Sequence, residues 1–108
     1  MEIRIKCQGV EESPWMKAYL VRQLLRFERY LTHASLIFIE LTHGPDESSS
    51  FMSIKLGQSY FTFKCFGGDI FEAFTKTFEE AGRCMRREHQ KQLNRIHRKL
   101  IVAKAINE

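Results

Sequence analysis

The sequence has few of the features that mark membrane, secreted or metal-binding proteins. No apolar run approaches the roughly 20 residues that a membrane-spanning helix needs, and the N-terminal MEIRIKCQG alternates charged and apolar residues where a signal segment would be apolar. Only three cysteines occur, Cys7, Cys65 and Cys84, and no two of them form a Cys-x-x-Cys pair. This odd number of widely spaced cysteines favours reduced thiols in a cytoplasmic protein, so we expect neither a disulfide framework nor a metal site.

Patterns typical of catalysis are also missing. The sequence has four histidines, scattered at His33, His43, His89 and His97. No spacing typical of a Ser/His/Asp triad, a Cys/His pair or a phosphate-binding loop accompanies them. We therefore expect a protein that is not an enzyme and that uses no cofactor.

What the sequence does contain is an uneven distribution of charge. The chain of 108 residues is 44% hydrophobic and 28% charged, as in an ordinary globular protein, and its net charge is +4. Residues 1–75 carry a net charge of −1, whereas residues 76–108 carry 9 basic and 4 acidic groups. The excess positive charge therefore lies in the last third of the chain. A localised basic stripe is the electrostatic footprint of a protein that binds a phosphate backbone.

Hydrophobic periodicity predicts four strands and two helices. The strands are expected at 2–7, 35–43, 51–56 and 59–66, with a polar loop over 44–50 and a tight turn at Gly57-Gln58. One helix is expected from Pro14, after the N-cap Ser13, with an apolar face that continues to Leu31. The other is expected to begin at Ile70, after the N-cap Asp69, and to run past residue 100.

This order of elements, β-α-β-β-β-α, predicts an α+β fold. We expect a four-stranded sheet with both helices packed on one face, similar to double-stranded-RNA-binding domains. Residues 1–108 would form a single domain, in which residues from about 96 to 108 are a C-terminal helical extension. Trp15, at the start of the first helix, is expected to pack against the protein and not to stack on a base.

Two apolar surfaces are left over by this arrangement. The open face of the sheet would carry Phe38, Tyr60 and Phe66. The end of the second helix would carry a stripe of Leu93, Ile96 and Leu100. The aromatic residues are either scattered surface residues or a contact with a partner or a second copy, and the stripe is a second candidate for self-association.

Helical spacing places most basic residues of the second helix opposite its apolar face, and a second basic set lies on the first helix. Two helices side by side could present one cationic surface to phosphate groups, which arginine binds in bidentate pairs. The candidate RNA-binding residues are Lys17, Arg22, Arg26, Arg29, Arg83, Arg86, Arg87, Lys91, Arg95 and Arg98. Two residues interrupt the pattern: Glu80 is expected on the basic face itself, and Gly82 within a helix costs about 1 kcal/mol relative to alanine.

Two stretches together carry a resemblance to a known family. VEESPWMKAYLVRQLLRFERYL is similar to the first helix, and GGDIFEAFTKTFEEAGRCMRREHQKQL to the second helix, of the ribosome hibernation-promoting factor family, also called the ribosome-associated inhibitor or sigma-54 modulation protein family. The opening of the family's second helix is matched by Asp69, Phe71, Ala73 and Phe74, and its basic positions are matched by Arg83, Arg87 and Lys91. Gln23 and Glu80 stand where the family often has basic residues.

The resemblance implies a small cytoplasmic bacterial protein of stress or stationary phase. Such proteins bind the small ribosomal subunit, with its 16S rRNA, between head and body, in the channel used by mRNA and tRNA. Binding silences and protects idle ribosomes. Longer members carry a second, dimerising domain, and this chain is expected to be a short form without it.

Two other functions stay open. One is a general double-stranded-RNA-binding domain, although such domains usually carry basic residues at the start of their last helix, where this sequence has DIFEAF. The other is a protein-interaction module of the same fold that has lost ribosome binding. That module would use the open-face aromatics or the C-terminal apolar stripe.

Overall fold

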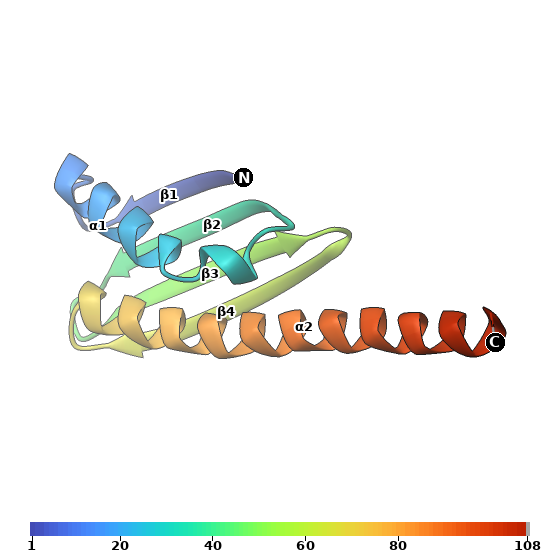
Figure 1. Cartoon of the computed structure of the whole chain (residues 1–108). Coiled ribbons are helices and arrows are strands. Elements are labelled where there is room, and N and C mark those ends of the chain that lie inside the picture. Colours follow the sequence, from blue (N-terminus) through green and yellow to red (C-terminus); the bar gives the residue numbers. More distant parts are fainter. Residues whose placement is uncertain (108) are drawn as a thin grey trace.

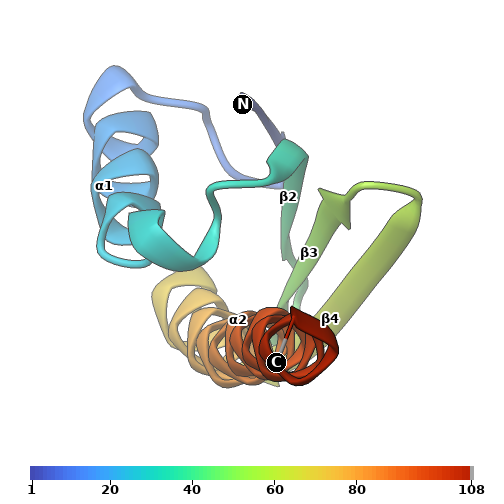
Figure 2. The ribbon, with the colours of Figure 1, turned by 45° about the vertical axis from the view of Figure 1, so that its right-hand side comes forward.

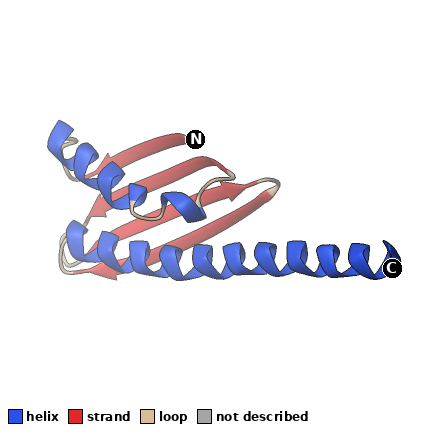
Figure 3. Ribbon diagram, viewed as in Figure 1, coloured by secondary structure: helices blue, strands red, loops and turns tan. Residues whose placement is uncertain are grey.

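The computed structural model describes the backbone of residues 1–107 and the side chains of residues 1–95. The elements follow in the order β1 (Glu2–Gln8), α1 (Pro14–Leu25), the short 3₁₀ helix η1 (Glu28–Tyr30), β2 (Ala34–His43), β3 (Ser48–Leu56), β4 (Ser59–Gly67) and α2 (Ile70–Asn107) (Figures 1 and 3). The α+β fold predicted from the sequence is confirmed. Over the residues described, neither helix has the length and apolar character needed to cross a membrane.

The four strands form one mixed sheet in which the spatial order, β1-β2-β3-β4, is also the order in the sequence. β1 runs parallel to β2 because the segment containing α1 carries the chain back along the sheet. Short connections make β2, β3 and β4 antiparallel neighbours. The predicted turn between β3 and β4 is confirmed at two residues, and Gly57 there has the positive φ, 59°, that such turns favour.

Alternation along the strands gives the sheet one apolar and one mixed face. Both helices lie on the apolar face and leave the other face uncovered (Figure 2). Residues from α1, the sheet and α2 share the resulting core, among them Leu20, Ile37, Ile39, Met52, Phe74 and Met85. Each large apolar side chain buried in this way contributes roughly 1.5–3 kcal/mol, so the sheet-to-helix contact supplies most of the stability.

The two helices begin as the sequence predicts. The side-chain oxygen of Ser13 accepts a hydrogen bond from the N–H of Met16 at 3.3 Å, and Pro14 follows at the first helical position. At α2, the Asp69 carboxylate accepts the N–H of Glu72 at 2.8 Å. The Glu72 carboxylate in turn accepts the N–H of Gly68, which holds the pKa of Glu72 below its usual range with help from Lys76.

The first helix is shorter than predicted. It ends at Leu25 because the N–H of Arg26 donates a hydrogen bond to the carbonyl oxygen of Gln23 at 3.2 Å, which tightens the last turn. The η1 turn then replaces regular helix. Phe27 and Leu31 still pack on the core. The helical spacing of apolar residues in the sequence therefore continues beyond the end of the helix.

The third strand begins earlier than predicted. Ser48–Ser50 were assigned to a loop, but they continue the pairing of β3 with both β2 and β4. Ser48 and Ser50 are fully buried, and the buried hydroxyl of Thr77 in α2 lies 3.3 Å from the carbonyl oxygen of Ser50. Serines here leave room for α2 to approach the strand closely, which explains polar residues at core positions.

Candidate nucleic-acid interface

Aromatic side chains join the first turns of α1 and α2. Trp15 stacks on Phe71 with ring centroids 5.8 Å apart, and Tyr19 meets the edges of Phe71 and Phe74 at 5.9 and 6.4 Å. Trp15 therefore packs as predicted, yet 63% of its surface stays exposed. Phe71 is exposed beside it, although its ring contacts both Trp15 and Tyr19.

A glycine of α2 makes room for an aromatic ring from the segment that follows α1. A Cβ atom built on Gly82 would lie 2.3 Å from Cζ of Phe27, which is closer than real atoms approach. The missing side chain therefore leaves the space that the Phe27 ring fills. The ring packs on Phe78 with centroids 4.6 Å apart, and the Arg86 guanidinium lies over it at 5.3 Å. Gly82, unfavourable on helix propensity alone, is explained by this contact.

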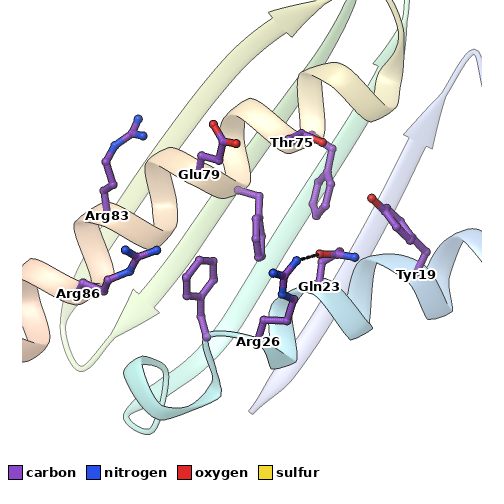
Figure 4. Close-up of a pocket in the computed structure, with 10 residues that line it drawn as sticks. Tyr19, Gln23, Arg26, Thr75, Glu79, Arg83 and Arg86 are labelled. Atoms are coloured by element: carbon purple, nitrogen blue, oxygen red, sulfur yellow. Dashed lines mark hydrogen bonds between the residues drawn. The ribbon is translucent and has the colours of Figure 1, made fainter.

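Between α1 and α2 lies a groove of about 590 Å³, which we call the interhelical groove (Figure 4). Its apolar walls come from Tyr19, Phe27, Phe74 and Phe78. Its polar lining consists of Gln23, Arg26, Thr75, Glu79, Arg83 and Arg86. Residues from two distant segments of the chain thus meet at one concave surface.

The electrostatics of the interhelical groove are dominated by three arginines. Arg26 reaches toward α2 and donates a hydrogen bond to the Gln23 side-chain oxygen at 3.0 Å (Figure 4). Arg83 and Arg86 line the groove from α2. Glu79 is the one acidic residue in the lining, and within residues 1–95 no carboxylate forms an ion pair with these arginines. Such a surface attracts anions.

The predicted RNA-binding residues fall into two groups. Arg26, Arg83 and Arg86 line the interhelical groove, and Arg87 joins two of them in an adjoining hollow of about 280 Å³. These four residues are the ones that the structure brings together. Arginines supply the positive charge of both hollows, and this charge suits phosphate groups.

The other candidates are dispersed. Lys17 pairs with Glu12, which precedes α1, at 3.2 Å, and it is not part of the lining of the interhelical groove. Lys91 pairs with Glu88 at 3.3 Å. The rest are Arg22 and Arg95, exposed on their helices, Arg29, which lies over the Tyr30 ring at 4.7 Å, and Arg98, which lies outside the described side chains.

The structure places Glu80 away from the basic face and places Glu79 in the interhelical groove. Glu80 was predicted on the basic face, but its carboxylate accepts a hydrogen bond from the Cys65 thiol of β4 at 3.4 Å. It therefore points toward the sheet edge, away from α1. Glu79 lines the interhelical groove instead, and so does Gln23. Helical spacing alone could not reveal this, because it does not show on which side of α2 the first helix packs.

The cysteines show no sign of reactive or ligating character. Cys7, Cys65 and Cys84 are free and half-buried, and burial is the main cause that raises the pKa of each thiol. In the part of the chain with described side chains, no three His, Cys, Asp or Glu residues are grouped in a way that could hold a metal ion.

The solved structures that share this fold include two at low sequence identity. A ribosomal subunit interface protein from Coxiella burnetii superposes with a TM-score of 0.75 and 18% identity, over 83% of this chain and 99% of that one. The N-terminal domain of Protein Y from Thermus thermophilus gives a TM-score of 0.71 and 15% identity, over 81% and 98%. No protein-family model and no curated protein sequence matches the chain. The resemblance predicted from the sequence is thereby confirmed at the level of the fold.

Proposed function

We propose that this protein is a ribosome-associated hibernation factor that binds rRNA of the small subunit through the interhelical groove. The observation that carries the proposal is the meeting of Arg26, Arg83 and Arg86, from two distant segments, in one concave surface with a single acid. The fold shared with a ribosomal subunit interface protein supports it. The protein would act in the cytoplasm by binding and not by catalysis.

The arrangement suits the backbone of structured RNA. Each guanidinium can form a bidentate, charge-assisted pair with a phosphate. Arg86 rests on Phe27, and Phe27 is held by Gly82 and Phe78, so less side-chain freedom is lost when a phosphate binds. Contacts of this kind respond to the shape of the RNA more than to its base sequence.

Following the family resemblance, we further propose that the protein occupies the channel of mRNA and tRNA between head and body of the small subunit. Occupancy of that channel would silence idle ribosomes and protect them. Small subunits loaded with mRNA and P-site tRNA should then bind the protein much more weakly than empty subunits. Equal binding to loaded and empty subunits would contradict this location.

The test of the groove compares two double variants that lose the same charge. We expect Arg83→Gln/Arg86→Gln to weaken cosedimentation with small subunits by about a hundredfold or more, since a hydrogen bond to a charged group contributes about 1.5–3 kcal/mol. The control, Lys17→Gln/Lys76→Gln, removes two cations that already pair with acids, and we expect nearly wild-type binding. Equal loss in both variants would refute the assignment of the groove.

A naked RNA duplex serves as the competitor in the same experiment. If the protein is a ribosome-binding factor, excess duplex should displace it poorly from small subunits at physiological salt. Efficient displacement would instead indicate a general double-stranded-RNA-binding domain. Absence from the ribosome fractions even at low salt would refute ribosome binding, because electrostatic association is strongest there.

A further inference from the structure

The uncovered face of the sheet carries a diagonal line of phenylalanines. Pairing across the strands produces parallel rows on this face, of which three are Arg4–Phe38–Ser53–Thr62, Lys6–Glu40–Phe51–Lys64 and Gln8–Thr42–Ser49–Phe66. Phe38, Phe51 and Phe66 therefore occupy successive rows on the successive strands β2, β3 and β4. The rings of Phe38 and Phe51 meet edge to face at 6.2 Å, and Phe66 is 48% exposed. We call these three residues the phenylalanine diagonal.

Cations lie between and beside these rings. The Lys64 ammonium lies 5.5 Å from the centre of the Phe66 ring, and Lys55 lies equally far from Tyr60 in the remaining row. Two acids share this face, and both are already paired: Glu2 with Arg4 at 2.8 Å and Glu40 with Lys6 at 4.0 Å. Among the side chains described, Lys55 and Lys64 therefore carry the uncompensated charge of this surface.

Small side chains separate the aromatic ones. Ser49 pairs with Phe66 and Ser53 pairs with Phe38, so each of these two rings has a serine next to it in its row. Phe66 is exposed, whereas Phe38 and Phe51 are partly buried, and the serine hydroxyl groups lie beside the rings. A flat ligand that stacks on Phe66 would displace the flexible Lys64 side chain from the ring and leave its ammonium free to contact a phosphate.

We propose that this face binds single-stranded RNA. Unpaired bases would stack on the phenylalanine diagonal while Lys55 and Lys64 contact phosphates, and stacking on aromatic side chains is how many sheets hold single-stranded nucleic acid. A second copy of the chain fits less well, because a two-fold contact would bring together two faces that each carry the uncompensated positive charge of Lys55 and Lys64. The site is independent of the interhelical groove, since the helices cover the opposite face of the sheet (Figure 2).

The probe is a fluorescein-labelled oligouridylate of about eight nucleotides, followed by anisotropy at low salt. Phe66→Ala should weaken binding by about five- to a hundredfold, the range for loss of one stacked base, and Lys64→Gln should weaken it as well. The matched control is Leu93→Ala, which removes an exposed apolar side chain of α2 and should change nothing. Circular dichroism confirms that each variant is folded.

Further readouts separate this site from the proposed ribosome site. Arg83→Gln/Arg86→Gln should retain oligouridylate binding, and Phe66→Ala should retain cosedimentation with small subunits. Trp15, on the helix side, should keep its fluorescence when the oligonucleotide binds. Two phosphate contacts predict a shallow dependence of log K on log salt, with a slope of about −1.4.

Several outcomes would overturn the proposal. Unchanged oligouridylate affinity in a folded Phe66→Ala variant would do so, as would loss of that affinity in Arg83→Gln/Arg86→Gln. A concentration-dependent dimer in sedimentation, abolished by Phe66→Ala, would assign the face to a second copy of the chain instead. No measurable binding of the wild-type protein to the oligonucleotide at low salt would also exclude it.

Discussion

Replacing Gly82 by alanine sets helix propensity against packing. On propensity alone the substitution should stabilise α2 by about 1 kcal/mol, because glycine has the greater freedom in the unfolded chain. The new Cβ, however, would lie 2.3 Å from Cζ of Phe27 and 2.8 and 2.9 Å from its two Cε atoms. The ring cannot retreat easily, because Phe78 packs on it at 4.6 Å and Arg86 lies over it.

Packing should win this competition. Overfilling a well-packed site costs about 1–3 kcal/mol, so the net effect of Gly82→Ala should be a loss of up to about 2 kcal/mol of unfolding free energy. Urea unfolding followed by circular dichroism measures this change. The sign of this change is the test, because replacing a surface glycine of a helix by alanine would raise the unfolding free energy.

Two controls make the result interpretable. Thr75→Ala and Thr75→Gly compare the same two residue types at an exposed site of α2, where alanine should be the more stable by about 1 kcal/mol. In a Phe27→Leu background, whose smaller side chain relieves the clash, Gly82→Ala should no longer destabilise. If Gly82→Ala raises the stability of the otherwise wild-type protein by the full propensity gain, the packing argument is wrong.

Two further predictions concern buried polar groups. Thr77→Val keeps the shape of the side chain but removes a buried hydroxyl that lies within reach of two backbone carbonyls, so the unfolding free energy should fall by about 1–2 kcal/mol in urea titrations, and an unchanged value would contradict the role of the hydroxyl. Because burial raises the pKa of Cys7, Cys65 and Cys84, the folded protein holds less thiolate at neutral pH than the unfolded chain, and iodoacetamide should alkylate it more slowly. Raising the pH above the usual thiol range should speed the folded protein's reaction, and mass spectrometry counts the modified sites. Equal rates for folded and urea-unfolded protein would disprove this effect of burial.

The parts of the fold that were predicted correctly depend on local signals. Alternation of apolar residues indicates a strand wherever one face is buried, and Ser13 and Asp69 act on N–H groups only three residues away. The errors occur where contacts with a segment distant in the sequence determine the local structure. Ser48–Ser50 look like loop residues until α2 is placed over them, and Leu31 keeps helical spacing although the backbone has already changed to η1.

In the candidate site, too, local patterns identified the residues, whereas tertiary contacts determine how they are arranged. Residue type and helical spacing identified the basic residues, but whether two of them share a groove depends on which sides of α1 and α2 meet. Glu79 and Glu80 are neighbours in the sequence, yet one lines the interhelical groove and the other bonds to Cys65. Phe51 was missed on the open face although alternation with the buried Met52 and Ile54 places it there. That it lies beside Phe38 follows from strand register, which the sequence does not state.

The parallel edge strand has a consequence for how the molecule assembles and opens. β2, β3, β4 and α2 form from consecutive residues joined by short turns, whereas β1 can pair with β2 only after the whole segment containing α1 has closed back on the sheet. We therefore expect β1 and α1 to fold last. We also expect their amide hydrogens to exchange through local unfolding that costs less free energy than the unfolding of β2, β3, β4 and α2. The interhelical groove has one wall in each of these two units. Any ligand bound across it would tie the late-folding unit to the early one, and would slow amide exchange in β1 although it touches no residue there.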